Sequence, residues 1–210
     1  MVFSLRRTIR WLVIILILLF CTEMAAAHFF PMPYGEEVAR TCGENEISKA
    51  LLYAVMKAES NFEVSAESAK GAKGIMQMMP ETAAWCAEKK GENAPDLFVP
   101  EESIRVGAYY LSFLLNRYGG NEKTAVAAYN AGHGRVDAWL SDTAYAKDGK
   151  TLSKIPFPET EKYVKKVMLY KKIYEKRIRQ QKKRLFGLFQ TAVFYCASKN
   201  AYSMDANASG

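Results

Sequence analysis

The stretch AVMKAESNFEVSAESAKGAKGIMQMMP, residues 54–80, places a glutamate, Glu59, at the end of an apolar helix pattern. Small and polar residues follow, with Gly71 and Gly74 among them, and a second apolar run begins at Ile75. A carboxylate at such a junction serves either solubility or chemistry. The side of the helix on which Glu59 lies distinguishes these two roles.

Glu59 lies on the apolar side of its helix. At 100° per residue, Leu52, Val55 and Met56 share its face. Glu59 also ends the helix, where the macrodipole disfavours negative charge. Burial and the dipole both raise the pKa of a carboxyl group, and a glutamate that is protonated near neutral pH can act as a general acid. The alternative is an exposed glutamate at a helix end without a role.

The loop after Glu59 predicts the floor of a ligand groove. Gly71 and Gly74 permit close approach to the main chain, and we expect Gln77 and Met79 to bring an amide and a thioether to the rim. Met76 or Met78 would then face the core. The loop lacks the G-x-x-x-x-G-K-[ST] pattern of a phosphate loop. A plain loop-to-helix connection is the alternative for the glycines, and core packing is the alternative for the other side chains.

The rest of the chain predicts helices joined by loops, in a mainly α fold without a period-2 strand pattern. We expect helices over residues 35–42, 45–60, 81–89, 100–118, 121–131, 135–140 and 160–184, with helical turns at 75–79. The segments 61–74, 91–100 and 141–158 predict loops. Residues 185–210 lose helical periodicity, which predicts a partly disordered tail.

Length and charge limit the class of protein. The 210 residues suit one domain with a real core, and half of them are hydrophobic. The net charge of +7 suits an anionic partner, such as nucleic acid, acidic lipid or an anionic wall polymer, without choosing among them.

The N-terminus predicts export. Arg6, Arg7 and Arg10 precede the apolar run at 11–20, and an A-x-A step follows at residues 25–27. We expect residues 1–27 to be a signal peptide cleaved after Ala27. An uncleaved membrane anchor is the alternative, because flanking arginines can snorkel to the interface. Either outcome places the domain outside the cytoplasm, in the cell envelope, and disfavours nucleic acid as a partner.

The numbers of cysteines and histidines in the chain do not predict a metal site. Cleavage after Ala27 would leave Cys42, Cys86 and Cys196, an odd number, so we expect buried or half-buried free thiols. The chain has two histidines, too few for a credible zinc cluster.

Four motifs, in order, resemble the catalytic domain of the soluble lytic transglycosylases, which are related in fold to goose-type lysozyme. They are ESNF at 59–62, GAKGIMQMMP at 71–80, AYNAG at 128–132 and PETEKYVKKV at 158–167. The resemblance covers roughly residues 30–175, and residues 176–210 have no counterpart in it. His133 stands where the family usually has proline, which we expect to change only a turn.

The resemblance implies a lysozyme-like α-helical domain with a groove for peptidoglycan strands and no cofactor. It implies cleavage of the β-1,4 bond between N-acetylmuramic acid and N-acetylglucosamine, with attack by the sugar's own 6-hydroxyl and formation of 1,6-anhydromuramyl ends. Glu59 would protonate the leaving oxygen and then accept the proton of the 6-hydroxyl. The positions that match the family's groove residues are Ser68, Gln77, Met79 and Tyr129, and Glu159 matches a supporting acidic position.

Other interpretations remain open at this point. Glycosidases usually use two carboxylates, so a hydrolytic muramidase would need Glu63 or Glu67 to hold a water. A non-catalytic glycan-binding module is disfavoured, because a binder gains nothing from a desolvated acid. For Tyr129 the alternative is an aromatic side chain that packs in the core. For Glu159 the alternative is an acid that complements the dipole at a helix N-terminus.

The helix over residues 162–184 is dense in lysine and arginine. A solvated face is the default interpretation. The alternative is salt-sensitive attraction to an anionic wall polymer or to membrane phosphates.

Overall fold

The computed structural model describes the backbone of residues 2–208 and the side chains of residues 7–191. Its helices are α1 (Val2–Phe29), α2 (Gly35–Glu44), α3 (Lys49–Glu59), α4 (Pro80–Lys90), α5 (Pro100–Arg117), α6 (Glu122–Ala131), α7 (His133–Ser141) and α8 (Pro158–Ala208). In this described part, strand-like pairing is limited to two isolated bridges, Glu67–Lys73 and Lys73–Met78. The mainly α fold class is therefore confirmed.

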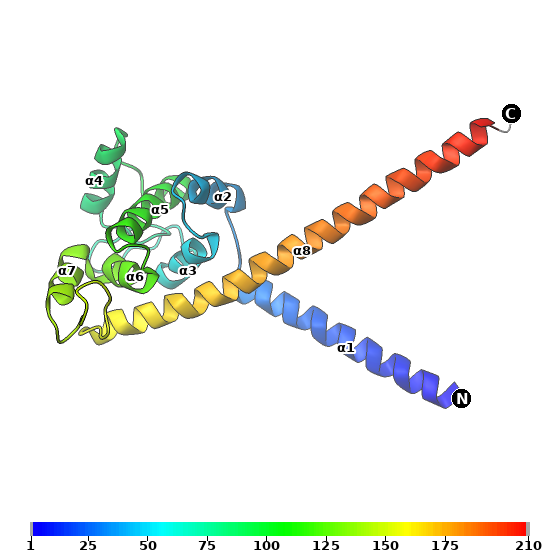
Figure 1. Ribbon diagram of the computed structural model, residues 1–210, viewed down its shortest axis with the longest axis horizontal. Helices are drawn as coiled ribbons and strands as arrows, with labels where there is room; N and C mark the ends of the chain where they lie inside the picture. Colours follow the sequence, from blue (N-terminus) through cyan, green and yellow to red (C-terminus); the bar gives the residue numbers. More distant parts are fainter. Residues whose placement is uncertain (1, 209–210) are drawn as a thin grey trace.

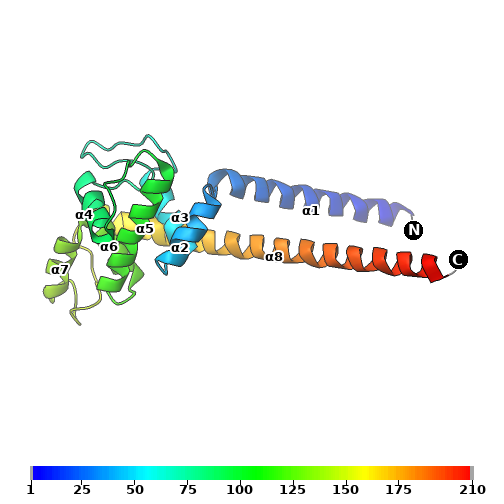
Figure 2. The ribbon, with the colours of Figure 1, turned by 90° about the horizontal axis from the view of Figure 1, so that it is seen from above.

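Helix α3 lies at the centre of the body. All its side chains from Ala50 to Met56 are buried. It packs along the first part of α8, while α5 packs against α2, α4 and α6. Figures 1 and 2 show α2 to α7 gathered around one end of α8. A helix buried on nearly all sides can position the side chain at its end firmly.

Helix α8 extends far beyond the body. Its side chains at Val164, Val167 and Tyr174 are buried in the core, and the helix then continues to Ala208. The expectation of a partly disordered tail over residues 185–210 is therefore wrong for 185–208, which continue the helix. Helix α1 leaves the body on the same side, so both ends of the chain point away from it (Figures 1 and 2).

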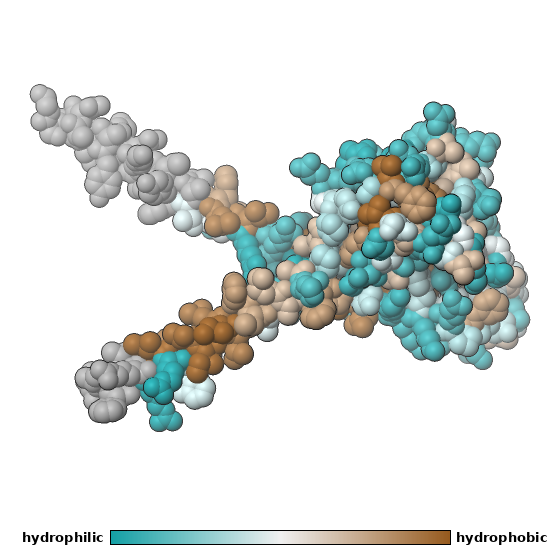
Figure 3. Space-filling model, turned by 180° about the vertical axis from the view of Figure 1, so that it is seen from behind, coloured by the Kyte–Doolittle hydropathy of each residue, from teal (hydrophilic) through white to brown (hydrophobic). Residues whose placement is uncertain are grey.

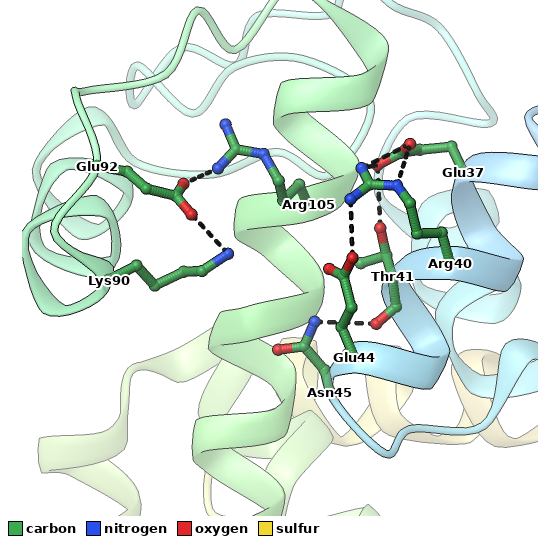
Figure 4. A network of polar contacts seen from close by, with 8 residues as sticks. All are labelled: Glu37, Arg40, Thr41, Glu44, Asn45, Lys90, Glu92 and Arg105. Carbon is green, nitrogen blue, oxygen red and sulfur yellow. Dashed lines mark hydrogen bonds and ion pairs between the residues drawn. The ribbon is translucent and has the colours of Figure 1, made fainter.

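Polar contacts at the surface brace helix α2 and the segment after α4 (Figure 4). On α2, Arg40 donates to Glu37 at 2.6 Å. In the segment after α4, Glu92 pairs with Lys90 at 2.9 Å and with Arg105 of α5. Exposed pairs of this kind contribute little to stability, but they fix the course of the segment that leads into α5.

Several helix boundaries differ from the sequence-based expectation. Helix α2 continues through Gly43, and α3 begins at Lys49 rather than at 45, because Ser48 is extended. Residues 75–77 form a turn and Met78 is in a bridge, in place of helical turns. The cap at Asn121 is confirmed, since its side chain accepts from the Thr124 N–H.

The expected free thiols are confirmed for two positions. Cys42 and Cys86 are buried and unpaired, and burial raises the pKa of each thiol. Cys196 lies outside the described side chains.

Candidate active site

Glu59 is the last residue of α3, and its surroundings are apolar, as predicted. Leu52, Val55 and Met56, on its face of the helix, are fully buried. Glu59 as a whole residue is half-buried. Loss of hydration raises its pKa to about 7. Glu59 is therefore about half protonated at neutral pH, which suits a group that must both give and take a proton.

Two residues of α8 moderate this shift. The Tyr163 hydroxyl donates to Glu59 Oε1 at 2.6 Å, and the Lys166 ammonium donates to the Ala58 carbonyl at 2.8 Å. Both favour the charged carboxylate and lower the pKa of Glu59, though less than burial raises it. Lys166 also satisfies a free carbonyl at the end of α3. The first turns of α8 thus hold the acid in position.

The chain turns sharply just after Glu59. Asn61 and Phe62 have φ angles of 54° and 69°, in the left-handed region that non-glycine residues rarely adopt. The Ser60 hydroxyl donates to the Ile75 carbonyl at 2.9 Å. This bond ties the end of α3 to the second motif and limits how far Glu59 can move.

The second motif forms a compact loop held by its own main chain. Gln77, at φ 46°, donates its side-chain amide to the Ala66 and Gly74 carbonyls at 2.9 and 3.0 Å. The Ser68 hydroxyl accepts from the Ala72 N–H at 3.0 Å. The amide nitrogen of Gln77 therefore braces the loop, whereas the sequence had suggested only a groove contact.

Gly74 is required in this loop. Its φ is +71°, and a Cβ added there would lie 1.8 Å from the Leu97 carbonyl oxygen. Gly71 has a similar φ of +85° but faces open space. Only Gly74 permits a close approach of main chain to main chain.

Tyr129 of α6 connects the loop to the acid. Its hydroxyl donates to the Met76 carbonyl at 2.9 Å and lies 3.1 Å from Met78 Sδ. Burial and the charge of Glu59 both raise the pKa of Tyr129 well above its usual value. Both methionine side chains are buried, where one had been expected. The structure thus brings Glu59, Tyr129 and Tyr163 together.

Two other predicted groove residues are at the surface. Met79, just before α4, is 38% exposed, as expected for a rim residue. Glu159 is exposed in the first turn of α8 and, among the described residues, makes no hydrogen bond or ion pair. Its neighbour Thr160 is buried instead and donates to Asn130 Oδ1 at 2.8 Å.

The other acids near this end of α3 have partners of their own. Glu63 is fully exposed and accepts from the Ser65 N–H and hydroxyl. Glu67 pairs with Lys73 at 3.6 Å. Within the described side chains, neither contacts Glu59, so the site contains one carboxyl group in an apolar setting.

Tyr163 and Lys166 were not identified from the sequence as site residues. A signal for Tyr163 was present, because it lies in the fourth motif and shares an apolar stripe with Thr160, Val164 and Val167. That stripe predicts a residue facing the core. The stripe cannot predict with which side chain of another helix the Tyr163 hydroxyl forms a hydrogen bond.

Comparisons with known proteins identify one family. Residues 38–152 match the family model described as Transglycosylase SLT domain. The chain is 37% identical over 152 residues to the soluble lytic murein transglycosylase of Salmonella typhimurium, covering 69% of this chain and 23% of that protein. It is 36% identical over 115 residues to the membrane-bound lytic murein transglycosylase C of Edwardsiella ictaluri, covering 49% and 32%.

Solved structures give the same result. The chain is similar to an inactive glutamate-to-glutamine mutant of the lytic transglycosylase Slt from Pseudomonas aeruginosa, with a TM-score of 0.64, 38% identity and coverage of 71% and 25% of the two chains. It is similar to the 70 kDa soluble lytic transglycosylase of Escherichia coli, with a TM-score of 0.66, 32% identity and coverage of 73% and 26%.

The chain spans about a quarter of the length of these soluble relatives, since it covers 23% of the Salmonella protein. The family match spans more than half of the chain, from residue 38 to 152. It includes Glu59, the loop of residues 61–79 that contains Gly71 and Gly74, which we call the glycine loop, and Tyr129. The chain therefore belongs to the Transglycosylase SLT domain family.

Proposed function

We propose that this protein is a lytic transglycosylase of the cell wall. It cleaves the β-1,4 bond between N-acetylmuramic acid and N-acetylglucosamine in peptidoglycan and leaves 1,6-anhydromuramyl ends. The observation that carries the proposal is a single carboxyl group, Glu59, with its pKa raised to about 7 in an apolar setting.

Glu59 serves first as acid and then as base. Its proton passes to the glycosidic oxygen as the bond from that oxygen to C1 of muramic acid breaks. The 6-hydroxyl of the same sugar then forms the new bond to C1 and returns its proton to the Glu59 carboxylate. Glu59 ends the cycle protonated, and no water is consumed.

One carboxyl group is sufficient for this reaction. A hydrolase needs a second carboxylate to activate water or to attack the sugar. Here the nucleophile is already attached to the reacting ring, so its effective concentration is high. The local partners of Glu63 and Glu67 favour this mechanism over hydrolysis.

The remaining site residues divide into groove contacts and supports. Tyr129 and Met79 adjoin the bound glycan on either side of the glycine loop, and Ser68 contributes from within that loop. The Gln77 side chain contributes its carbonyl oxygen, because its amide nitrogen donates within the loop. Glu159 acts at the edge of the groove, and Tyr163 positions Glu59.

The protein acts in the cell envelope, outside the cytoplasm. Helix α1 contains a stretch, Arg7–Phe29, that is long and apolar enough to cross a membrane, with none of its most apolar window buried. This stretch is either a signal peptide that is removed or an anchor that remains. In both forms the basic α8 faces the anionic polymers or lipids of the envelope.

The products test the reaction. The purified protein should release muropeptides from peptidoglycan that are one water lighter than hydrolysis products. In water labelled with oxygen-18, mass analysis should find no label at the new muramic acid ends. Labelled reducing ends would instead identify a hydrolase.

Matched variants test the assignment of the acid. Glu59→Gln should abolish release, while Glu63→Gln and Glu67→Gln should retain it with the same unlabelled products. Loss of activity in Glu63→Gln or Glu67→Gln with intact folding would contradict the single-acid mechanism.

A further inference from the structure

Helix α8 carries an apolar stripe that continues after the core has ended. Its core-facing positions are Val167, Tyr174 and Ile178, which are buried or half-buried. Two helical turns beyond Ile178 the same face carries Leu185, and then Phe189. These positions lie roughly 10 Å or more further along the helix than Ile178 at 1.5 Å per residue.

Nothing in the described body covers this continuation. Leu185, Leu188 and Phe189, which we call the distal stripe, are 61%, 68% and 66% exposed. In Figure 3, apolar surface is visible on the outer part of α8, near the undescribed side chains, and along α1. An uncovered apolar segment of this size at the end of a long helix indicates a binding surface.

A band of positive charge precedes the distal stripe. Glu175 is the acidic residue there, and the cations that follow it are Lys176, Arg177, Arg179, Lys182, Lys183 and Arg184. The order along the helix is thus core, then cations, then apolar side chains. This order matches the layers that a protein meets on approaching an anionic bilayer, with headgroup phosphates before acyl chains.

Helix α1 leaves the body on the same side as α8, although the two helices diverge (Figure 1). Outward from the body it carries Glu23, then its apolar run, and then Arg10 and Arg7, so its cations lie beyond its apolar residues rather than before them. The Glu23 carboxylate pairs with Arg184 at 2.9 Å, and beyond that level α1 becomes the apolar run of residues 11–20 while α8 becomes the distal stripe. Both helices project from the same side of the body (Figures 1 and 2). A membrane that receives α1 therefore lies where the distal stripe reaches.

A hollow beside α8 favours lipid as the occupant. It is open, with a volume of about 1320 Å³, and Arg177, Lys182 and Leu185 of α8 border one side of it, while residues from the segments 31–36 and 48–53 and Ala27 of α1 border the other. Two carboxylates, Glu36 and Glu175, also line it, so a phosphate would bind on the side of the α8 cations. In the described part of the chain, Arg177 Nη1 is buried without a hydrogen-bond partner. Cations and apolar side chains around one hollow suit a phosphate headgroup with its acyl chains. A soluble wall polymer would leave the apolar side chains exposed.

We propose that the segment from Lys176 to Phe189 of α8 is a second membrane contact, which binds anionic phospholipid with its cations and inserts the distal stripe among the acyl chains. The contact acts alongside α1 where α1 is retained, and in its place where cleavage after Ala27 removes it. It keeps the catalytic end of the molecule at a set distance from the bilayer. The proposal does not depend on the reaction proposed above.

Depth-dependent quenching tests the contact in the full chain. The full chain carries one added tryptophan in place of Phe189 or of Leu169, together with Trp11→Phe, because Trp11 lies in the apolar run of α1 and would itself be quenched. It is reconstituted in vesicles of phosphatidylcholine and phosphatidylglycerol with brominated acyl chains, and the emission of the Trp11→Phe chain, which comes from Trp85 and Trp139, is subtracted. Leu169 is the matched control, because it is an exposed leucine on the same helix beside the body, at 58%. The Phe189→Trp emission should be quenched and the Leu169→Trp emission should not. Equal quenching, or none at either position, would overturn the proposal.

Flotation separates the second contact from α1. The form beginning at His28 retains all core side chains, since the core cluster and its partners start at Phe30. This form should float with vesicles containing phosphatidylglycerol. The floated fraction should fall at least about tenfold in Leu185→Ser/Phe189→Ser, because the two substitutions remove most of the inserted apolar area. Leu169→Ser should leave flotation unchanged.

Other occupants give different results. Binding to a soluble polyanion with the same affinity in Leu185→Ser/Phe189→Ser, without flotation, would indicate a wall polymer and overturn the proposal. Self-association in the absence of lipid that Leu185→Ser/Phe189→Ser abolishes, again without flotation, would indicate a second copy of the chain and overturn it too.

Discussion

The carboxyl group of Glu59, which we propose as the catalytic acid, makes the folded protein less stable above neutral pH. Its pKa in the folded chain is about 7, against 4.5 for a free glutamate. Between those values the folded chain holds a proton that the unfolded chain has released. The free energy of unfolding therefore falls as pH rises through this window, by up to about 3 kcal/mol.

Glu59→Gln should separate the two effects. Glutamine stays neutral, so the variant should have a higher melting temperature than the wild type at pH 8 and no such advantage at pH 4. Its turnover on peptidoglycan should fall at least about 10²- to 10⁴-fold, because an amide cannot give and retake the proton. Glu88→Gln, at an exposed position on α4, is the control and should change neither quantity. A Glu59→Gln variant that cleaves normally would remove Glu59 from the mechanism.

Tyr163→Phe should change the pH dependence more than the fold. The variant loses the 2.6 Å hydrogen bond that favours the Glu59 carboxylate, so the pKa of Glu59 should rise further. Because the first step needs protonated Glu59, the alkaline limb of the rate profile should move to higher pH. Tyr170→Phe is the control, since Tyr170 contacts Phe30 by its ring. An unmoved limb in a folded Tyr163→Phe protein would show that the hydroxyl does not tune the acid.

The helices could be predicted from local signals, but the contacts between them could not. Apolar spacing on one face placed Glu59 among Leu52, Val55 and Met56, because a helix repeats its faces every 3.6 residues whatever surrounds it. Tyr163 was missed because its partner lies 104 positions away in sequence. The bracing contacts of Gln77 were missed for a similar reason, since its amide nitrogen donates to main-chain carbonyls of a turn that no periodicity describes.

The end of α8 was mistaken for a different reason. Its last turns were expected to be disordered because their pattern no longer alternates between a core face and a solvent face. The helix continues there without a core, so amphipathic periodicity, which reports burial against a domain, carried no signal. The face of Ile178 continues through Leu185 and Phe189, but exposed Phe186 and Leu188 on other sides of the helix obscure its contrast with the polar face.

The glycine loop offers a paired test of close packing. Gly74→Ala should lower the free energy of unfolding by more than about 3 kcal/mol, because a left-handed φ and a clash with the Leu97 carbonyl occur together. Gly71→Ala meets open space and should cost only the backbone strain, about 1–2 kcal/mol. Urea denaturation of both variants measures the difference. Equal losses would show that the loop can move away from Leu97.

In the whole molecule, a compact catalytic body sits at one end of two long helices (Figure 1). The two helices differ in what they contribute to folding. Helix α8 supplies Val164, Val167 and Tyr174 to the core, so the body cannot fold without its first half. Helix α1 is exposed along its apolar run, and the core begins only after it, at Phe30.

Removal of residues 1–27 should therefore leave the melting temperature of the body within about 2 °C of the full chain, which corresponds to at most about 0.5–1 kcal/mol. The losses are an exposed ion pair, Glu23 with Arg184, and the backbone hydrogen bond from the Phe30 N–H to the Ala26 carbonyl.

Phe30→Ala is the matched control, because the Phe30 ring packs edge-on against Tyr170 and Tyr174, with ring centroids 5.5 and 5.8 Å apart. That variant should lose at least about 1 kcal/mol through the ring contacts and the half-buried area. If the form beginning at His28 melted as low as Phe30→Ala, α1 would be part of the folded body, and cleavage after Ala27 would be incompatible with a stable exported enzyme. A mature protein whose N-terminal mass begins at His28, with an unchanged melting temperature, is the expected result.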